Sequence, residues 1–406
     1  MSASRGAPVP AAGHPPASPG FRRLSVAVSA AGITTFALLY STQALLPLLG
    51  QHFAVSPAQS ALTVSLATLG LGAGLLVAGP LSDAWGRTPL LRASLGASVV
   101  VAVATALAPS WPALLVLRTL QGVALAGLPS VMIAYLREEV RPDAHARATG
   151  GYIGGTALGG MLGRLVTGGV AELAGWRAAL AVIAALAAAC ALVAHLLLPP
   201  STGFRATPQH PAALLRNLRT ALADRVLLAL YATGAALMGA FVAVYNALGF
   251  RLTAPPYALG VGAASLVFVA YAVGSVASPL AGRIADRRGR GPALRAATLV
   301  MAAGLLLTLP VPLAVLVLGV LVLTAAFFAA HGLASGWVSA RAHASGAGAG
   351  QASSLYLIAY YAGSSAAGAL AGGAWEATGW AGVVVLALGS LAVAVVLAQG
   401  PLRRAA

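Results

Sequence analysis

The chain has 406 residues, of which 59% are hydrophobic and 8% are charged, and 24 basic residues against eight acids give a formal charge of +16. Soluble domains carry about 25% charged residues, so this composition excludes an ordinary soluble protein and indicates a chain that lies in a bilayer. All the basic residues are arginines, and in a membrane protein their excess is better explained by membrane orientation than by nucleic-acid binding.

The chain begins with residues 1–22, which are rich in Pro, Ala, Gly and Ser and are predicted to form a disordered cytoplasmic tail. After this tail, twelve stretches have the roughly 20 mostly apolar residues that a helix needs to cross the hydrocarbon core. We expect six of them in a first lobe, residues 23–198, and six in a second lobe, residues 224–400. The expected spans are 25–49, 61–81, 91–108, 113–136, 148–170, 178–198, 226–250, 257–280, 294–309, 311–334, 352–372 and 380–398.

The connection between the two lobes, residues 199–223, mixes Pro, Arg and His and is predicted to be a cytoplasmic linker, and 401–406 form a short cytoplasmic tail. With both termini in the cytoplasm, 20 arginines lie in cytoplasmic tails and loops. Arg177 and Arg251 then lie outside, and Arg118 and Arg164 fall within spans. The positive-inside rule therefore favours this orientation over its reverse.

One spacing of Gly, Asp, Gly and Arg occurs twice in the chain, 203 residues apart. The two copies are Gly79, Asp83, Gly86, Arg87 and Gly282, Asp286, Gly289, Arg290. Each copy is a polar turn between two apolar runs, so both copies are expected on the same membrane face. The segment from Glu172 to Trp176 repeats from Glu376 to Trp380 at nearly the same offset. The sequence therefore predicts two copies of one six-helix unit, related by an axis along the membrane normal.

These residues give the chain a resemblance to the major facilitator superfamily, specifically to its twelve-helix bacterial efflux branch, the inner membrane transport proteins for drugs and sugars. The segment from Gly79 to Arg87 resembles the family's signature loop between helices two and three, although Ala84 and Thr88 replace the usual flanking basic residues. The resemblance implies an all-α integral membrane protein with 12 transmembrane helices in two pseudo-symmetric six-helix lobes.

Two further segments resemble motifs of proton-linked members of that family. Arg118-Thr-Leu-Gln121-Gly122 resembles a helix-four motif in which the arginine is associated with coupling. The glycines of the fifth span resemble the antiporter motif, with Thr156 where drug antiporters carry proline. The resemblance therefore implies an antiporter for small molecules, with protons as the coupled ion.

The repeated turns are candidates for gating. Asp83 and Arg87 are four residues apart at the cytoplasmic end of span two, so they can pair with each other or with charges and helix ends of the opposite lobe. Gly86 lets the chain turn. A carboxylate facing a helix N-terminus across the lobe interface would hold the cytoplasmic side shut, and its release would let the lobes rock. The alternative is a turn whose arginines only fix orientation.

Span five carries Gly151, Gly155, Gly159 and Gly163, spaced by four. This spacing lines one helix face with hydrogen atoms and lets a neighbouring helix approach closely. We interpret the stripe as a helix-packing surface, and a sliding surface during alternating access is a second, compatible interpretation.

A central cavity between the lobes would be lined by polar and aromatic residues of several spans. Arg118 and Arg164 are the only charged residues inside spans, where charge is costly and usually functional, although bonding to helix carbonyls is the alternative. The further candidates for substrate binding or coupling, each of which could instead be a packing residue, are Gln121, Tyr40, Gln43, Tyr245, Asn246, Tyr356, Tyr360 and His331. Of these, His331 is predicted to lie near the cytoplasmic end of span ten.

All eight acids fall in loops or at span ends, so no carboxylate is available in the bilayer core to exchange a proton for a cationic substrate. A neutral or anionic substrate fits better. The sequence thus favours a monomeric secondary active exporter of a small amphiphilic or weakly anionic solute in a bacterial inner membrane, with no metal, cofactor or nucleic acid. A metabolite importer or uniporter is the first alternative, and a non-transporting receptor is the alternative from another class. An enzyme would need paired acids or a comparable cluster, which the sequence lacks.

Overall fold

The computed structural model describes residues 13–15, 18–202, 204, 211–399 and 402. This part of the chain is almost entirely helical, and its one strand-like contact is an isolated bridge between His14 and Val140. The first half contains α1 (Pro19–Leu39), η1 (Gln43–Leu45), α2 (Leu46–Phe53), α3 (Pro57–Trp85), α4 (Arg87–Ala106), α5 (Trp111–Leu125), α6 (Gly127–Glu139), η2 (Pro142–Ala144) and α7 (His145–Leu197). The second half contains α8 (Pro211–Ala223), α9 (Arg225–Thr253), α10 (Val261–Ser265), η3 (Leu266–Val273), α11 (Gly274–Arg288), α12 (Arg290–Leu306), α13 (Leu313–Ser345), α14 (Ala349–Thr378) and α15 (Trp380–Gln399).

Nine helical stretches in the described residues are long and apolar enough to cross a membrane. The long helix α7 covers two expected spans. They are divided at Gly175, where the backbone leaves the helical conformation with φ 79° and ψ 172°. Two of the expected spans correspond to α12, which has only 17 residues, and to α14, and neither is among the nine. The number of twelve spans stays a prediction.

Two expectations about the ends of the helices need correction. The tail was expected to extend to residue 22, but α1 begins at Pro19, capped by the Ser18 side chain. The expected linker contains a helix, α8, over 211–223. His331 was placed near the end of span ten, but α13 continues to Ser345, so His331 lies near the middle of that helix. These helices continue beyond their apolar stretches into polar sequence. A hydropathy criterion detects only the apolar part of each helix. Most of the tail, residues 1–12, and most of 401–406 lie outside the described residues.

The two copies of the Gly-Asp-Gly-Arg motif form the same tight turn. Gly86 connects α3 to α4 with φ 98°, and Gly289 connects α11 to α12 with φ 86°. A side chain is strained in this region of backbone space, so glycine is the residue that the turn requires. Both turns lie at the end of the molecule that also carries α8.

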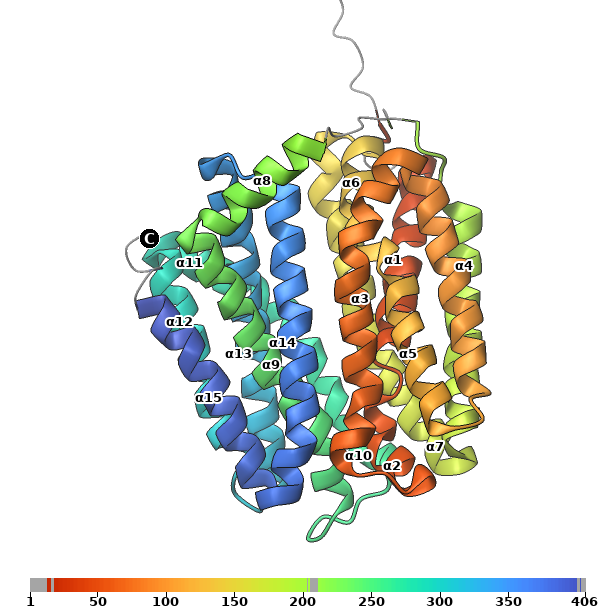
Figure 1. Ribbon diagram of the computed structural model, residues 1–406, viewed down its shortest axis with the longest axis vertical. Coiled ribbons are helices and arrows are strands. Elements are labelled where there is room, and N and C mark those ends of the chain that lie inside the picture. Colours follow the sequence, from red (N-terminus) through yellow and green to blue (C-terminus); the bar gives the residue numbers. More distant parts are fainter. Residues whose placement is uncertain (1–12, 16–17, 203, 205–210, 400–401, 403–406) are drawn as a thin grey trace, which may run out of the picture.

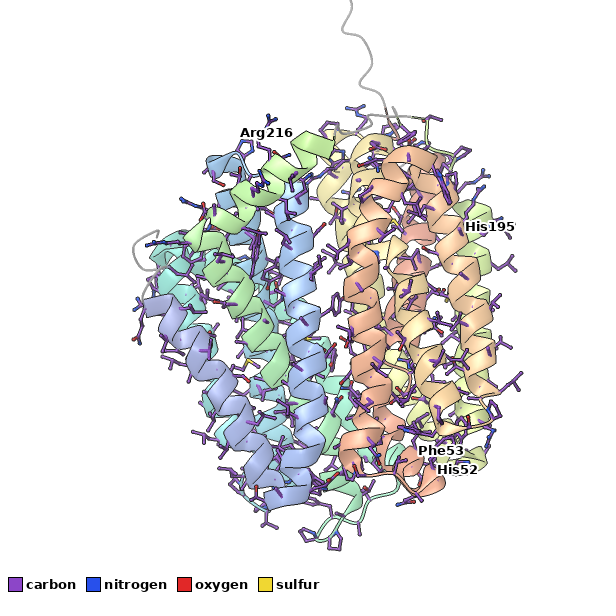
Figure 2. All side chains as sticks on the ribbon, viewed as in Figure 1. His52, Phe53, His195 and Arg216 are labelled. Carbon is purple, nitrogen blue, oxygen red and sulfur yellow. The ribbon has the colours of Figure 1, made fainter. Side chains whose placement is uncertain are left out.

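The helices form two groups side by side, with α1 to α7 in one group and α9 to α15 in the other (Figure 1). Helix α3 packs against α14, and α7 packs against α10 and η3, so these pairs build the interface between the groups. We call the end that carries α8 the α8 end and the opposite end the α2 end. Figure 2 shows Arg216 at the α8 end and His52 with Phe53 at the α2 end. The described helices thus form two lobes.

The glycine stripe of α7 faces α1. A Cβ atom placed on Gly155 would lie 2.3 Å from the carbonyl oxygen of Ser29, and one on Gly159 would lie 2.4 Å from that of Ile33. The same placement on Gly163 meets the Ala37 carbonyl oxygen at 2.7 Å, whereas Gly151 has more room, 3.4 Å from the Ser29 hydroxyl. At Gly155, Gly159 and Gly163 the two backbones are too close for a larger residue.

Candidate functional site between the lobes

A cavity of about 100 Å³ lies between the two lobes. The first lobe contributes α7 with Arg164 and the end of α1 with Tyr40, and the second lobe contributes aromatic residues of α9, η3, α13 and α14. The lining residues are Phe36, Tyr40, Ile153, Thr156, Ala157, Gly160, Arg164, Met238, Phe241, Tyr271, Phe327, Phe328 and Tyr360. Because both lobes line it, any relative motion of the lobes changes this cavity.

Arg164 is the charged centre of the cavity and is only 1% exposed. Its Nε donates to Gln43 Oε1 at 2.6 Å, one Nη donates to the carbonyl of Gly160, and the other donates to the Tyr271 hydroxyl at 3.1 Å. Gln43 in turn donates from Nε2 to Asn246 Oδ1 at 2.7 Å. Two hydrogen-bonded routes therefore run from Arg164 across the lobe interface, one to α9 and one to η3.

The guanidinium also lies over three aromatic rings. Its central carbon is 4.2 Å from the centroid of Tyr40, 4.5 Å from Tyr271 and 5.1 Å from Phe268. Cations are attracted to the faces of such rings, and this stabilises the charge where no acid is available. No acidic residue forms an ion pair with Arg164 in the described part of the chain.

The second lobe supplies an aromatic wall that the sequence did not single out. Phe241 and Phe327 stack with centroids 3.8 Å apart, and Phe241 also contacts Tyr271 at 5.5 Å and Phe328 at 6.2 Å. Phenylalanines are ordinary in a membrane span, so only their convergence on one cavity distinguishes them. The repeat gave a partial signal, because Phe241 and Tyr245 occupy the positions of Phe36 and Tyr40 in the first lobe.

Arg118 and Gln121 do not reach the cavity where we expected them. Arg118 donates from Nε to the Thr63 carbonyl at 2.9 Å and from Nη atoms to the carbonyls of Leu38, at 3.0 Å, and Leu39. Gln121 donates to the Ser98 carbonyl at 3.0 Å. All these partners belong to the first lobe. The expectation that both residues line the cavity is therefore wrong. For Arg118 the reason is that α1 ends at Leu39, so its last carbonyls attract the guanidinium.

The remaining candidates are close to one another around the aromatic wall. The hydroxyl of Tyr245 is hydrogen-bonded to that of Thr324 at 2.7 Å, and His331 Nδ1 lies 2.9 Å from the Tyr356 hydroxyl. Tyr360 lines the cavity and packs against His331, with ring centroids 4.8 Å apart. The structure thus brings together Tyr40, Gln43, Arg164, Tyr245, Asn246, Tyr360 and, one layer behind, Tyr356 and His331.

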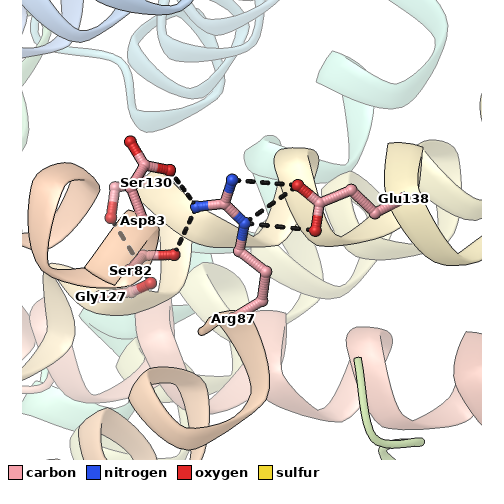
Figure 3. Close-up of polar contacts among 6 residues, drawn as sticks. All are labelled: Ser82, Asp83, Arg87, Gly127, Ser130 and Glu138. Atoms are coloured by element: carbon pink, nitrogen blue, oxygen red, sulfur yellow. Dashed lines mark hydrogen bonds and ion pairs between the residues drawn. The ribbon is translucent and has the colours of Figure 1, made fainter. Parts of the chain in front are cut away.

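The first motif copy forms a charged cluster at the α8 end (Figure 3). Arg87 donates from Nη1 to Asp83 at 2.5 Å and to the Ser82 hydroxyl at 2.7 Å. Its Nε and Nη2 donate to Glu138 on α6 at 3.0 to 3.3 Å, so one arginine joins α3, α4 and α6. The guanidinium side chain is 11% exposed. Asp83 thus pairs inside its own lobe here rather than with the opposite lobe.

The second motif copy lacks such a cluster. Asp286 and Arg290 are exposed, and neither forms an ion pair among the residues that the structure describes. The position that matches Glu138 at the repeat offset is Arg341, whose Nε instead pairs with Asp224 at 2.8 Å. The two turns share a backbone shape but differ in charge partners.

A second cavity, of about 420 Å³, opens between the lobes at the α8 end. Asp83, Arg87 and Ser130 line it from the first lobe, and Asn217 of α8 and Gly348 of the second lobe line the other side. Gly348 precedes α14, whose first turn has no side-chain cap. The motif carboxylate and the start of α14 therefore share the walls of one cavity.

The lobes meet closely at the α2 end, through two acids that repeat at nearly the same offset as the motif. Glu172, at the end of the first section of α7, accepts the backbone N–H of Gly262 at 2.5 Å. Glu376, near the end of α14, accepts the backbone N–H of Ala58 in the first turn of α3 at 3.0 Å. Each lobe thus places one carboxylate on the start of a helix of the other lobe. The sequence showed this pair only as part of the repeat.

Comparison with known proteins agrees with this architecture. The sequence profile of the Major Facilitator Superfamily matches residues 26–367. The chain belongs to the major facilitator superfamily. It is 41% identical over 366 residues to the inner membrane transport protein YnfM of Escherichia coli (strain K12), covering 90% of this chain and 87% of that protein. It is 40% identical over 367 residues to the uncharacterized MFS-type transporter YybF of Bacillus subtilis (strain 168), covering 90% of each.

A solved member of similar shape is a D-xylose–proton symporter, with a TM-score of 0.73 and 16% identity, over 94% of this chain and 96% of that one. At this identity the likeness concerns the fold alone. The all-α major facilitator fold, the multi-pass membrane location and membership of a transporter family are thereby confirmed for this major facilitator protein. Among its described residues there is no group of three or more His, Cys, Asp or Glu that could hold a metal ion.

Proposed function

We propose that this protein is a secondary active exporter that moves a small amphiphilic or weakly anionic organic solute across a bacterial inner membrane by alternating access. Its lobes, 23–198 and 224–400, rock about the central cavity, with both termini and the α8 end in the cytoplasm. The observation that carries the proposal is the uneven contact between the lobes, which enclose a cavity of about 420 Å³ at the α8 end and are joined by the Glu172 and Glu376 contacts at the α2 end. This corresponds to the inward-facing half of a transport cycle.

The cytoplasmic latch is part of the same proposal. When the lobes close over the α8 end, Asp83 comes to the first turn of α14, where N–H groups without intrahelical partners and the helix dipole favour a carboxylate. In the present state Arg87 holds that carboxylate in place within the first lobe. The gating role of both motif copies, Asp83 with Arg87 and Asp286 with Arg290, remains part of the proposal.

Transport in membrane vesicles tests the function. We expect uptake of the solute into inverted vesicles, driven by an imposed pH gradient, and weaker uptake into right-side-out vesicles, in a screen of amphiphilic and weakly acidic solutes. Asp83→Asn should reduce the flux several-fold without changing the amount of inserted protein, because the amide lacks the charge that α14 attracts. Asp143→Asn is the matched control, because this carboxylate is 52% exposed and lines neither cavity. A receptor would give no concentrative flux in either vesicle, and an importer would reverse the preference.

The paired acids at the α2 end give a second prediction. Replacing both, as Glu172→Ala with Glu376→Ala, removes two contacts that exist only while the outer side is closed, so the outward-open population should rise several-fold. Spin labels at Pro109→Cys and Ala377→Cys, in a Cys190→Ala background, would report the separation of the lobes at this end. The single variants should give intermediate shifts. An unchanged distance distribution in the double variant would show that these carboxylates do not hold the outer side closed.

A further inference from the structure

We propose that the cavity between the lobes binds a small aromatic carboxylate, with the carboxylate on Arg164 and the ring against the aromatic wall of the second lobe. This inference rests on the proposed function and narrows its substrate class. Three independent features of the cavity carry it, namely its charge, its unused hydrogen-bond donors and its walls.

The first feature is an uncompensated positive charge. Arg164 is buried between the lobes, and every acid of the chain lies in a loop or near a helix end outside the cavity lining. A buried charge without a counter-ion is costly inside a membrane. A cationic solute would raise that cost and a monoanion would remove it, so the cavity selects for negative charge.

The second feature is the set of donors that remain. A guanidinium has five N–H groups, and three of those of Arg164 have partners, which leaves one on each terminal nitrogen. Two such donors match the two oxygens of a carboxylate. The hydroxyl of Tyr40, which lines the same cavity, is buried and has no hydrogen-bond partner. A carboxylate on Arg164 would give this hydroxyl an acceptor.

The third feature is the size and chemistry of the walls. Phe241, Phe327 and Phe328 offer only apolar surface opposite Arg164, and aromatic rings pack well on such surfaces. The volume of about 100 Å³ is of the order of the ~150 Å³ cavity that admits benzene in an engineered protein core. A single ring therefore fits with small side-chain movements, whereas a large multi-ring solute does not fit this state of the protein.

Calorimetric titration of the purified full chain with benzoate tests the inference. We expect saturable binding of benzoate, and at least about tenfold weaker binding of benzamide, which keeps the ring but lacks the charge, and of acetate, which keeps the charge but lacks the ring. Arg164→Gln should weaken benzoate binding by at least about tenfold and reduce the difference between benzoate and benzamide.

A second pair of variants tests benzoate binding in the cavity even if Arg164→Gln does not fold. Tyr40→Phe removes one unpartnered hydroxyl from the cavity and should weaken benzoate binding several-fold. Tyr152→Phe removes an equally buried and unpartnered hydroxyl that does not line the cavity, and it should leave binding unchanged. Equal affinities in these two variants, or equal affinity for benzoate and benzamide, would overturn the inference.

The outcome is separable from that of the proposed function. If benzoate does not bind but the vesicles accumulate another solute, the proposed substrate class is wrong and the proposed export function is retained. If benzoate binds but no solute is moved in either vesicle orientation, the site stands and the transport function is wrong.

Discussion

Arg118→Met is expected to lower the free energy of unfolding by about 3 kcal/mol, because hydrogen bonds from a charged group contribute about 1.5–3 kcal/mol each and their loss leaves buried acceptors unpaired. The arginine joins the last carbonyls of α1, at Leu38 and Leu39, to the Thr63 carbonyl of α3. Methionine fills similar space but donates nothing. Thermal melts of the purified protein in detergent measure the effect.

Arg118→Lys is the informative companion variant. It keeps the charge, but a single ammonium group cannot reach both helices. The stability of Arg118→Lys should therefore lie between that of the parent protein and that of Arg118→Met. Flux measurements complete the comparison. A variant that melts like the parent protein but no longer transports would return Arg118 to the coupling role expected from its motif, and would contradict a mainly structural role.

Arg87→Met is expected to cost about 2 kcal/mol of stability and to reduce flux strongly, because it leaves Asp83 and Glu138 close together without their common cation. The two carboxylate side chains are 27% and 24% exposed, so solvent relieves part of their repulsion. The three helices that meet at this arginine should separate at the α8 end. Thermal melts and vesicle flux measure the two effects.

The second repeat supplies the control for this change. Arg290→Met alters the matching position, where the arginine is exposed and forms no ion pair in the described part of the chain. We expect its stability to stay within about 0.5 kcal/mol of the parent protein, as is usual for surface substitutions. Equal losses of stability in the two variants would show that the ion pairs of Arg87 with Asp83 and Glu138 do not stabilise the protein.

Much of the architecture could be predicted from the sequence because the bilayer imposes it. Apolar length and the repeated Gly-Asp-Gly-Arg turns indicated two helical lobes, and intramembrane polar residues such as Arg164, Gln43 and Asn246 were singled out because polarity there is costly. The hydrogen bond between Gln43 and Asn246 agrees with the repeat, since the two residues occupy matching positions in the two lobes.

Other features depended on three-dimensional detail that no pattern carries. Arg118 and Arg164 look alike in the sequence, and only the end of α1 at Leu39 determines that one faces helix carbonyls and the other faces the cavity. Tyr271 reaches Arg164 from the 3₁₀ segment η3, a local backbone irregularity that hydropathy cannot reveal. The contacts of Glu172 and Glu376 at the α2 end could not be predicted either, because the repeat of these two acids indicated no role for them.

The four ion pairs among the described residues all stay within a single lobe, three in the first and one in the second. Rocking of the lobes would therefore break none of these four pairs. The membrane voltage would act on the charges inside the spans, Arg118 and Arg164, and on whatever Arg164 holds. A bound monoanion cancels the charge of Arg164, so the loaded carrier would sense the voltage less than the empty carrier does.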